Sequence, residues 1–302
     1  MSVTPNPRRG YILGLFAYCI WGMFPLYFKT LDGIPSQEVI VHRVLWSALF
    51  SAGLLLIWQH KNWWQELYSH PKRFLVLAAS GALIASNWLI YVWSVHNDRM
   101  VEASLGYYIN PLVNVLLAML FLRERLRRLQ WVAIALAAIG VGLQVWSFGE
   151  VPWISLALAC SFGFYGLIRK QAPVAALPGL TVETWMLVPV ALGWLWLNPQ
   201  AMSMQSEFLG SGQMLWLAAA GPVTLIPLLC FNGAAKHLPY ASLAFLQYIT
   251  PTLLLLLAVL VFNEPFAAQS LIFFGFIWAG LAVYSWDALR VLKHGRKMLT
   301  KK

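Results

Sequence analysis

Long apolar runs fill almost the whole chain and leave only short polar connectors between them. A helix that crosses a membrane needs about 20 consecutive apolar residues. Because the backbone must satisfy its own hydrogen bonds inside lipid, such runs favour helices. The sequence therefore predicts an all-α membrane protein with ten transmembrane helices. We expect them at residues 10–28, 36–58, 74–96, 101–122, 129–147, 152–168, 180–197, 213–233, 240–262 and 267–288.

The composition agrees with a membrane protein and excludes a soluble domain. Hydrophobic residues make up 60% of the 302 residues and charged residues only 11%. Soluble domains carry about 25% charged residues. A chain of this length with so few charges could not cover an aqueous surface.

Lysine and arginine residues gather in alternate connectors. If the N-terminus lies in the cytoplasm, the connectors on the other side carry only Lys29 and Arg99, and Arg43 lies within a span. The cytoplasmic segments carry the other 18, namely Arg8, Arg9, Lys61, Lys72, Arg73, Arg123, Arg125, Arg127, Arg128, Arg169, Lys170, Lys236, Arg290, Lys293, Arg296, Lys297, Lys301 and Lys302. The positive-inside rule then predicts a multi-pass protein of a bacterial inner membrane with both termini in the cytoplasm. Because these charges mark topology and contact membrane lipid, we expect no nucleic-acid partner.

The second half of the chain repeats the first. Tyr-Ile-Asn-Pro at 108–111 recurs as Tyr-Ile-Thr-Pro at 248–251, a shift of 140 residues, and Glu124 meets Glu264 at the same shift. Five spans are an odd number, so the second copy must be inserted upside down, as in secondary transporters. The sequence predicts one five-helix repeat at 9–147, a second at 151–288, and a basic cytoplasmic tail at 289–302.

Each copy carries a proline, a glutamate thirteen residues later, a glutamine, and a glycine in an apolar span. These residues are Pro111, Glu124, Gln130 and Gly140, and then Pro251, Glu264, Gln269 and Gly280. The pattern resembles the EamA repeat of the drug/metabolite transporter superfamily. The N-terminal segment, with Gly10-Tyr11 and Ala17-Tyr18, is similar to the RarD-type branch. The resemblance implies two inverted EamA-type repeats that transport small organic molecules without a cofactor. The second half has no obvious counterpart of Arg43.

Pro111 and Pro251 each fall near the middle of a span. A mid-helix proline frees a carbonyl one turn earlier, here those of Tyr107 and Gln247. Such a carbonyl needs a partner from the protein or from a wet cavity. We therefore expect two helix breaks beside a substrate site at the bilayer midplane. Its candidate residues are Tyr108, Asn110, Asn114, Gln247, Tyr248 and Thr250. In the alternative, each proline only bends its helix and the polar side chains close the backbone again.

Arg43, Asn87 and Trp88 are further candidates for substrate binding. A cation within a span costs at least about 2.5–3.5 kcal/mol, so Arg43 should have a partner or a wet cavity. Glu38 and Glu102 are the carboxylates nearest to it in depth. Arg43 either attracts an anionic or zwitterionic substrate or ties helices together near the outer mouth. Asn87 faces either the substrate or a neighbouring helix.

Other polar and small residues have simpler expected roles. Glu124 and Glu264 are each expected to cap the N-terminus of the next helix, where negative charge is favourable. Glu183, near the inner end of the seventh span, is the best single candidate for a proton site. Small residues at Ala133/Ala137 and Gly275/Ala279 are spaced for close helix packing, within the fold or between the protomers of a homodimer.

These patterns together predict a secondary transporter. The six histidines and three cysteines form no pattern typical of a nucleophile or a metal centre, so we expect no enzyme, no metal and no cofactor. We expect export of small organic metabolites or drugs across the inner membrane by alternating access. The alternative is a non-transporting accessory or receptor protein of the membrane.

Overall fold

A computed structural model describes residues 6–58, 63–97, 99–205, 212–261 and 268–299. Over these ranges the chain is helical and contains no strand. The helices are α1 Pro7–Gly22, α2 Phe24–Lys29, α3 Ser36–Ile57, α4 Trp63–Tyr68, α5 Pro71–His96, α6 Met100–Phe121, α7 Arg128–Phe148, α8 Trp153–Gln171, α9 Ala176–Leu197, η1 Met202–Met204, α11 Gly212–His237, α12 Tyr240–Leu246, α13 Ile249–Leu260 and α14 Ala268–Leu299.

Nine helical segments of the described residues are long and apolar enough to cross a membrane. One of them joins α1 and α2, and another joins α12 and α13. Large apolar side chains such as Trp146, Trp196 and Leu56 are 80–87% exposed, as expected for a surface that faces lipid. The expected span at 152–168 forms α8, which is 19 residues long, carries Arg169 and Lys170 in its last turn, and is not among the nine. The chain is thus an all-α, multi-pass membrane protein.

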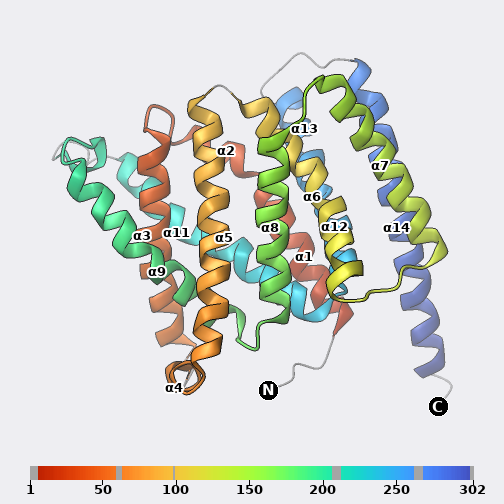
Figure 1. Cartoon of the computed structure of the whole chain (residues 1–302), viewed down its shortest axis with the longest axis horizontal. Coiled ribbons are helices and arrows are strands. Elements are labelled where there is room, and N and C mark those ends of the chain that lie inside the picture. Colours follow the sequence, from red (N-terminus) through yellow and green to blue (C-terminus); the bar gives the residue numbers. More distant parts are fainter. Residues whose placement is uncertain (1–5, 59–62, 98, 206–211, 262–267, 300–302) are drawn as a thin grey trace.

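Helices from the two halves of the chain interlock. α1 packs against α11 and α13, α3 against α9 and α11, α6 against α8 and α12, and α7 against α14. α5 packs against α8 and α9. Figure 1 shows α7 and α14 side by side at one edge of the bundle, α3 and α9 at the opposite edge, and the start of α1 and the end of α14 at the same end.

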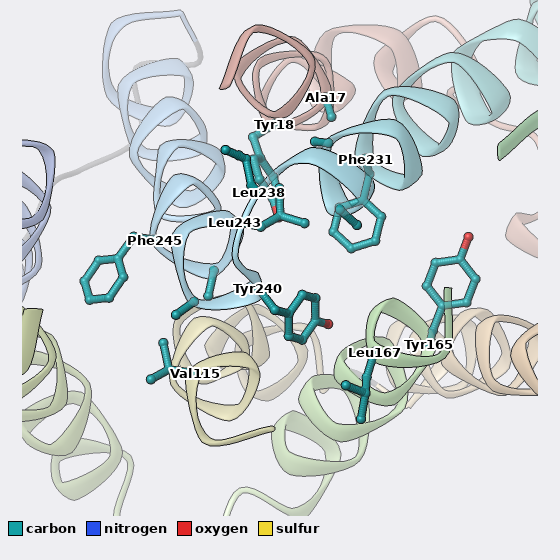
Figure 2. Close-up of a cluster of buried hydrophobic side chains, with 14 of the residues drawn as sticks. Ala17, Tyr18, Val115, Tyr165, Leu167, Phe231, Leu238, Tyr240, Leu243 and Phe245 are labelled. Atoms are coloured by element: carbon teal, nitrogen blue, oxygen red, sulfur yellow. The ribbon is translucent and has the colours of Figure 1, made fainter. Parts of the chain in front are cut away.

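The centre of the bundle is a core of apolar and aromatic side chains. Figure 2 shows Tyr18, Phe231 and Tyr165, which come from α1, α11 and α8 and are all fully buried. The Phe231 ring stacks on that of Tyr165 at a centroid distance of 6.3 Å. Rings of this size contribute large buried apolar areas, so they hold the two halves together where they cross.

α7 and α14 approach each other through small residues. Ala133 and Ala137 are fully buried, and a Cβ atom added to Gly140 or Gly280 would lie 2.8 Å from a carbonyl oxygen of the opposite helix. The expected packing role of the two alanines is therefore confirmed within the fold. Gly275 differs, because no described atom lies within 4 Å of its Cβ position.

Three carboxylates of the first half bind backbone N–H groups at the starts of helices in the second half. Glu38 accepts two hydrogen bonds of 2.9 Å from η1, and Glu102 accepts one of 2.8 Å from the first turn of α8. Glu124 accepts bonds of 2.6 and 3.1 Å from the first turn of α12. Negative charge at a helix N-terminus is stabilising. Glu124 therefore caps a helix as expected, but that helix is α12 and not the next helix, α7, where Gln130 accepts the N–H of Arg127. Glu264 lies outside the described residues.

Two lysines, one on α8 and one on α11, each donate hydrogen bonds to carbonyls at the C-terminal end of the other helix. Lys170, in the last turn of α8, donates to the carbonyls of Ala235 and Leu238 at the end of α11. Lys236, in the last turn of α11, donates to the carbonyls of Lys170 and Ala172 at the end of α8. Cations satisfy terminal carbonyls and suit the helix dipole. This exchange joins α8 and α11 at one end of the bundle.

Candidate functional site

Arg43 lies on α3 among side chains of three other helices. Its Nε donates to Thr224 Oγ1 of α11 at 2.9 Å. The guanidinium carbon lies 5.0 Å from the ring centroid of Trp88 on α5 and 5.9 Å from that of Phe28 on α2. A cation above aromatic faces gains about 0.5–2 kcal/mol. The structure therefore places two of the predicted site residues, Arg43 and Trp88, against each other.

No carboxylate of the described residues forms an ion pair with Arg43. Glu38 and Glu102, the two partners suggested by depth, instead bind the helix N-termini described above. The prediction that one of them pairs with Arg43 is wrong, because both carboxylates accept from backbone N–H groups and Glu102 also pairs with Arg99. The Nη groups of Arg43 therefore make no hydrogen bond among the described residues.

Phenol groups complete the surroundings of Arg43. The hydroxyls of Tyr27, Tyr91 and Tyr107 lie close enough to interact with it electrostatically. Tyr107 is 38% exposed, so it lies at the edge of this cluster. A guanidinium with both Nη groups free presents the paired donors that a carboxylate accepts. We refer to Arg43, Trp88, Phe28 and Thr224 as the Arg43 site.

Three residues of the predicted midplane site, Asn110, Asn114 and Gln247, lie in contact with one another. Asn114 and Gln247 are 133 residues apart in the sequence. Asn114 Nδ2 donates to Asn110 Oδ1 at 2.8 Å and to Gln247 Oε1 at 3.0 Å. Asn110 Nδ2 donates to the carbonyl of Ala159 at 2.8 Å, and Tyr240 donates to Asn114 Oδ1 at 3.1 Å. These buried groups bond to one another and to backbone, so they tie α6, α8 and α12 together in this conformation.

Tyr108, Tyr248 and Thr250 do not join these amides. The Tyr248 hydroxyl donates to the carbonyl of Tyr108 at 3.4 Å, and Thr250 Oγ1 donates to the carbonyl of Tyr18 at 3.0 Å. The Tyr108 ring packs edge-on against Phe274 at 5.6 Å. The six residues expected to line one midplane site thus occupy two separate sets of contacts.

The two prolines act differently. α6 continues without interruption through Pro111, so the break expected there is absent. The ninth segment is divided between α12 and α13, one turn before Pro251. There the N–H of Thr250 donates to the carbonyl of Gln247 at 3.1 Å. The carbonyl that Pro251 leaves free is therefore satisfied by the chain itself and is not available to a substrate.

Asn87 faces a neighbouring helix. Its Nδ2 donates to the carbonyl of Leu158 and to Ser161 Oγ, both at 2.9 Å and both on α8. The geometry favours the structural alternative for Asn87, because its amide hydrogens bind α8.

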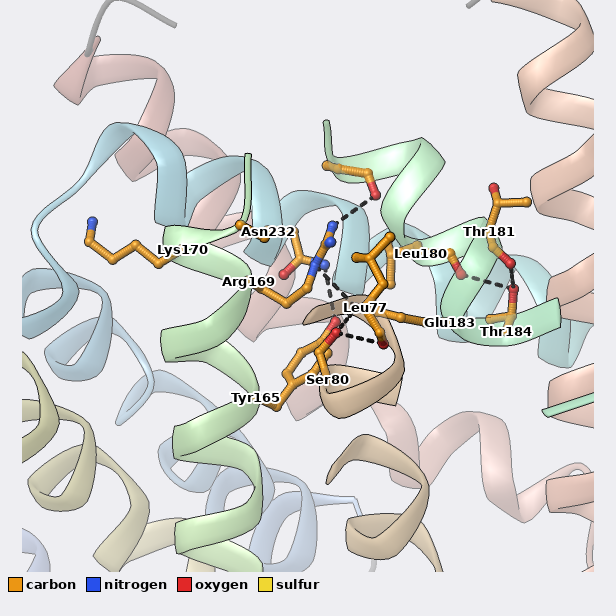
Figure 3. Close-up of polar contacts among 12 residues, drawn as sticks. Leu77, Ser80, Tyr165, Arg169, Lys170, Leu180, Thr181, Glu183, Thr184 and Asn232 are labelled. Carbon is orange, nitrogen blue, oxygen red and sulfur yellow. Dashed lines mark hydrogen bonds and ion pairs between the residues drawn. The ribbon is translucent and has the colours of Figure 1, made fainter. Parts of the chain in front are cut away.

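Arg169 is a buried residue that the sequence analysis assigned to a cytoplasmic connector. It lies on α8 with no exposed surface, and its Nε is 3.4 Å from Glu183 Oε1 on α9. Figure 3 shows this pair together with Ser80 of α5, which donates to the same carboxylate. For its partner Glu183, one sequence signal was present. Arg43 is the eighth residue of α3 and Glu183 is the eighth residue of α9, and the predicted shift of 140 residues relates the two.

Charged and amide side chains buried in a bundle of apolar helices are typical of membrane proteins that move polar molecules. The fold and these sites define a polytopic helical membrane protein of the transporter class. The chain belongs to the EamA-like transporter family, whose pattern matches residues 8–146.

Relatives over the full length agree. A protein of Pseudomonas aeruginosa that is named an uncharacterized transporter is 62% identical over 290 residues, covering 96% of this chain and 97% of that protein. Protein RarD of Salmonella typhi is 47% identical and covers 93% of this chain and 96% of its own length. These relatives place the chain in the RarD-type branch. A solved crystal structure superposes with a TM-score of 0.69 at 16% identity, over 94% of this chain and 99% of that chain, and supports the fold alone.

Proposed function

We propose that this protein is a secondary transporter that exports small organic anions or zwitterions across the bacterial inner membrane by alternating access. The observation that carries the proposal is the Arg43 site, in which a guanidinium with free Nη groups is flanked by two aromatic rings. A cation without an anionic partner is costly inside a span. A substrate carboxylate that binds the Nη groups in turn lowers that cost.

The proposed architecture is two inverted repeats, at 9–147 and 151–288, with α8 as the tenth span and 289–302 as a basic cytoplasmic tail. The helix pairing supports it. α1 packs on α11 as its counterpart α8 packs on α5, and α3 packs on α11 as α9 packs on α5. α3 and α9, and α7 and α14, pair with their own counterparts. Two copies related by a two-fold axis in the membrane plane produce this exchange.

The substrate class follows from the chemistry of the Arg43 site. The two Nη groups suit a carboxylate, and the Trp88 and Phe28 rings suit an apolar or aromatic body. The amide cluster of Asn110, Asn114 and Gln247 is assigned to holding the interface between repeats, because its donors bind protein groups. We expect amphiphilic carboxylates, including aromatic and branched amino acids, to be better substrates than their neutral amides.

The test is counterflow in proteoliposomes with purified protein and radiolabelled carboxylates, each compared with its own amide. Arg43→Gln should abolish counterflow of the carboxylates. Arg43→Lys should retain only part of it, because an ammonium is a point charge without the paired geometry. Arg128→Gln, at the exposed start of α7, is the matched control and should transport normally.

Two results would contradict the proposal. One is undiminished counterflow by Arg43→Gln, and the other is equal counterflow of amides and carboxylates. Binding of a carboxylate without any counterflow would favour a receptor instead.

A further inference from the structure

Arg169 and Glu183 form a second charged site, buried near the end of the bundle where α8 and α11 end and α9 begins. Arg169 has no exposed surface and Glu183 is 2% exposed. Besides Ser80, the Tyr165 hydroxyl lies beside the Glu183 carboxylate, and Asn232 of α11 donates to Tyr165 at 3.1 Å. Figure 3 shows side chains from four helices converging on this point.

Several buried polar atoms of this site have no hydrogen-bond partner. Arg169 Nη2 donates to the carbonyl of Ala176 at 3.2 Å, but Nε and Nη1 have no hydrogen bond. Glu183 Oε2 and Asn232 Oδ1 are also without partners. A buried polar atom left unsatisfied costs about 1–3 kcal/mol, and a charged one costs more. Such a concentration of unpaired groups is expected where a ligand completes the bonding.

The surrounding backbone is shaped for the guanidinium. A Cβ atom added to Gly179 would overlap Nη1 and Nη2 of Arg169, so the guanidinium lies directly against α9. Two further cations, Lys170 and Lys236, lie close enough to interact electrostatically with each other, and Lys236 also with Arg169. Lys170 also interacts with the Glu124 carboxylate, so three cations face two carboxylates, and the excess of one positive charge favours an anion.

The internal repeat supplies an independent argument. Because Arg43 and Glu183 occupy the same position in helices that the proposed repeat relates, the site of Arg169 and Glu183 is the counterpart of the Arg43 site. In alternating access, equivalent surfaces open in turn to the two sides of the membrane. In this conformation no carboxylate of the described residues pairs with Arg43, whereas Glu183 pairs with Arg169.

We propose that Arg169 forms a second carboxylate-binding site, which the Glu183 side chain occupies in this conformation. When the inner side opens, the carboxylate of the transported molecule replaces Glu183 on Arg169, and Glu183 turns to water. The identity of that molecule rests on the proposed function, but the binding site can be tested without any transport.

The first test uses chemical rescue of purified protein. Glu183→Ala leaves Arg169 buried without its anion, so the melting temperature should fall by several degrees. Sodium acetate should restore most of the loss, whereas acetamide or sodium chloride at the same concentration should not. The Arg169→Gln/Glu183→Ala double variant should show no response to acetate. Acetate that acts no better than acetamide, or equally well on the double variant, overturns the proposal.

The second test covers the case in which Glu183→Ala does not fold. Leu77, fully buried beside the pair, is replaced by Cys in a chain whose native cysteines are serine. Glu183→Gln keeps the shape of the side chain and removes its charge. In inside-out vesicles it should speed labelling of Leu77→Cys by a maleimide several-fold, and benzoate but not benzamide should slow that labelling.

The matched control is Asp287→Asn, which removes the carboxylate of another ion pair, that with Arg127 between α7 and α14. It should leave labelling of Leu77→Cys unchanged. Unchanged labelling in Glu183→Gln, or equal effects of benzoate and benzamide, overturns the proposal. Neither test depends on counterflow, so either can fail while the proposed function holds.

Discussion

What a guanidinium inside the membrane can do depends on whether the chain itself supplies its anion. Arg43 has a threonine and two rings as neighbours, so its Nη groups remain free for another carboxylate. Arg169 is held by Glu183, and its charge is already balanced in this conformation. The two residues therefore offer the same recognition chemistry in different states of occupancy.

The amide cluster gives a prediction at the level of one residue. Asn114→Leu leaves Asn110 Oδ1 and Gln247 Oε1 without their donor and removes an acceptor of Tyr240. Each buried group left unsatisfied costs about 1–3 kcal/mol. We expect a clear fall in the melting temperature of the detergent-solubilised protein.

The control for Asn114→Leu is Gln144→Leu. Gln144 Oε1 is buried without a partner, so removing it should leave the melting temperature unchanged or raise it. If Asn114→Leu is as stable as the parent protein, the amides do not hold the interface together.

Part of the candidate site could be predicted from the sequence. The recurring Tyr-Ile-Asn-Pro and Tyr-Ile-Thr-Pro segments indicate that the regions of Asn110 and Gln247 are related. A cation within an apolar run also makes Arg43 stand out as a candidate. Arg169 could not be recognised, because a cation at the end of an apolar run also suits the cytoplasmic boundary. Only the packing of α8 against α5 and α11 decides that its side chain turns inward.

The contact between α3 and α11 gives a prediction at the level of helices. A Cβ atom at Gly221 would lie 2.6 Å from the carbonyl oxygen of Trp46. Because the obstacle is backbone, the helices must separate, and such overpacking typically costs about 1–3 kcal/mol. Gly221→Ala should lower the melting temperature, whereas Gly53→Ala, with nothing within 4 Å of its Cβ position, should change it little. Equal effects of the two substitutions would contradict the close approach.

Helix positions could be predicted from apolar runs, but the effect of each proline could not. The sequence gives Pro111 and Pro251 the same local context, and only one of them stands beside an interrupted helix. The two prolines differ in the hydrogen-bonding groups that surround them in the folded protein. At Gln247 a local turn to Thr250 closes the backbone, and such a turn depends on tertiary packing rather than on composition.

The number of crossings gives a prediction for the whole molecule. If α8 spans the membrane, the connectors before and after it lie on opposite sides. A single cysteine at Glu150 should react with an impermeant maleimide added outside spheroplasts, and one at Pro173 should react only after permeabilisation. Both residues are exposed in the structure. Labelling of both from the same side would contradict ten spans and two cytoplasmic termini.

The carboxylate caps have a consequence for how the protein is made. Glu38, Glu102 and Glu124 belong to the first half, and every backbone group that they bind belongs to the second. During translation the acids enter the bilayer before their partners have left the ribosome. Glu38 and Glu124 therefore lack these partners until η1 and α12 have been made, whereas Glu102 already pairs with Arg99 of the first half. The two halves of the chain therefore depend on each other, and the capping bonds are complete only once α12 has been made.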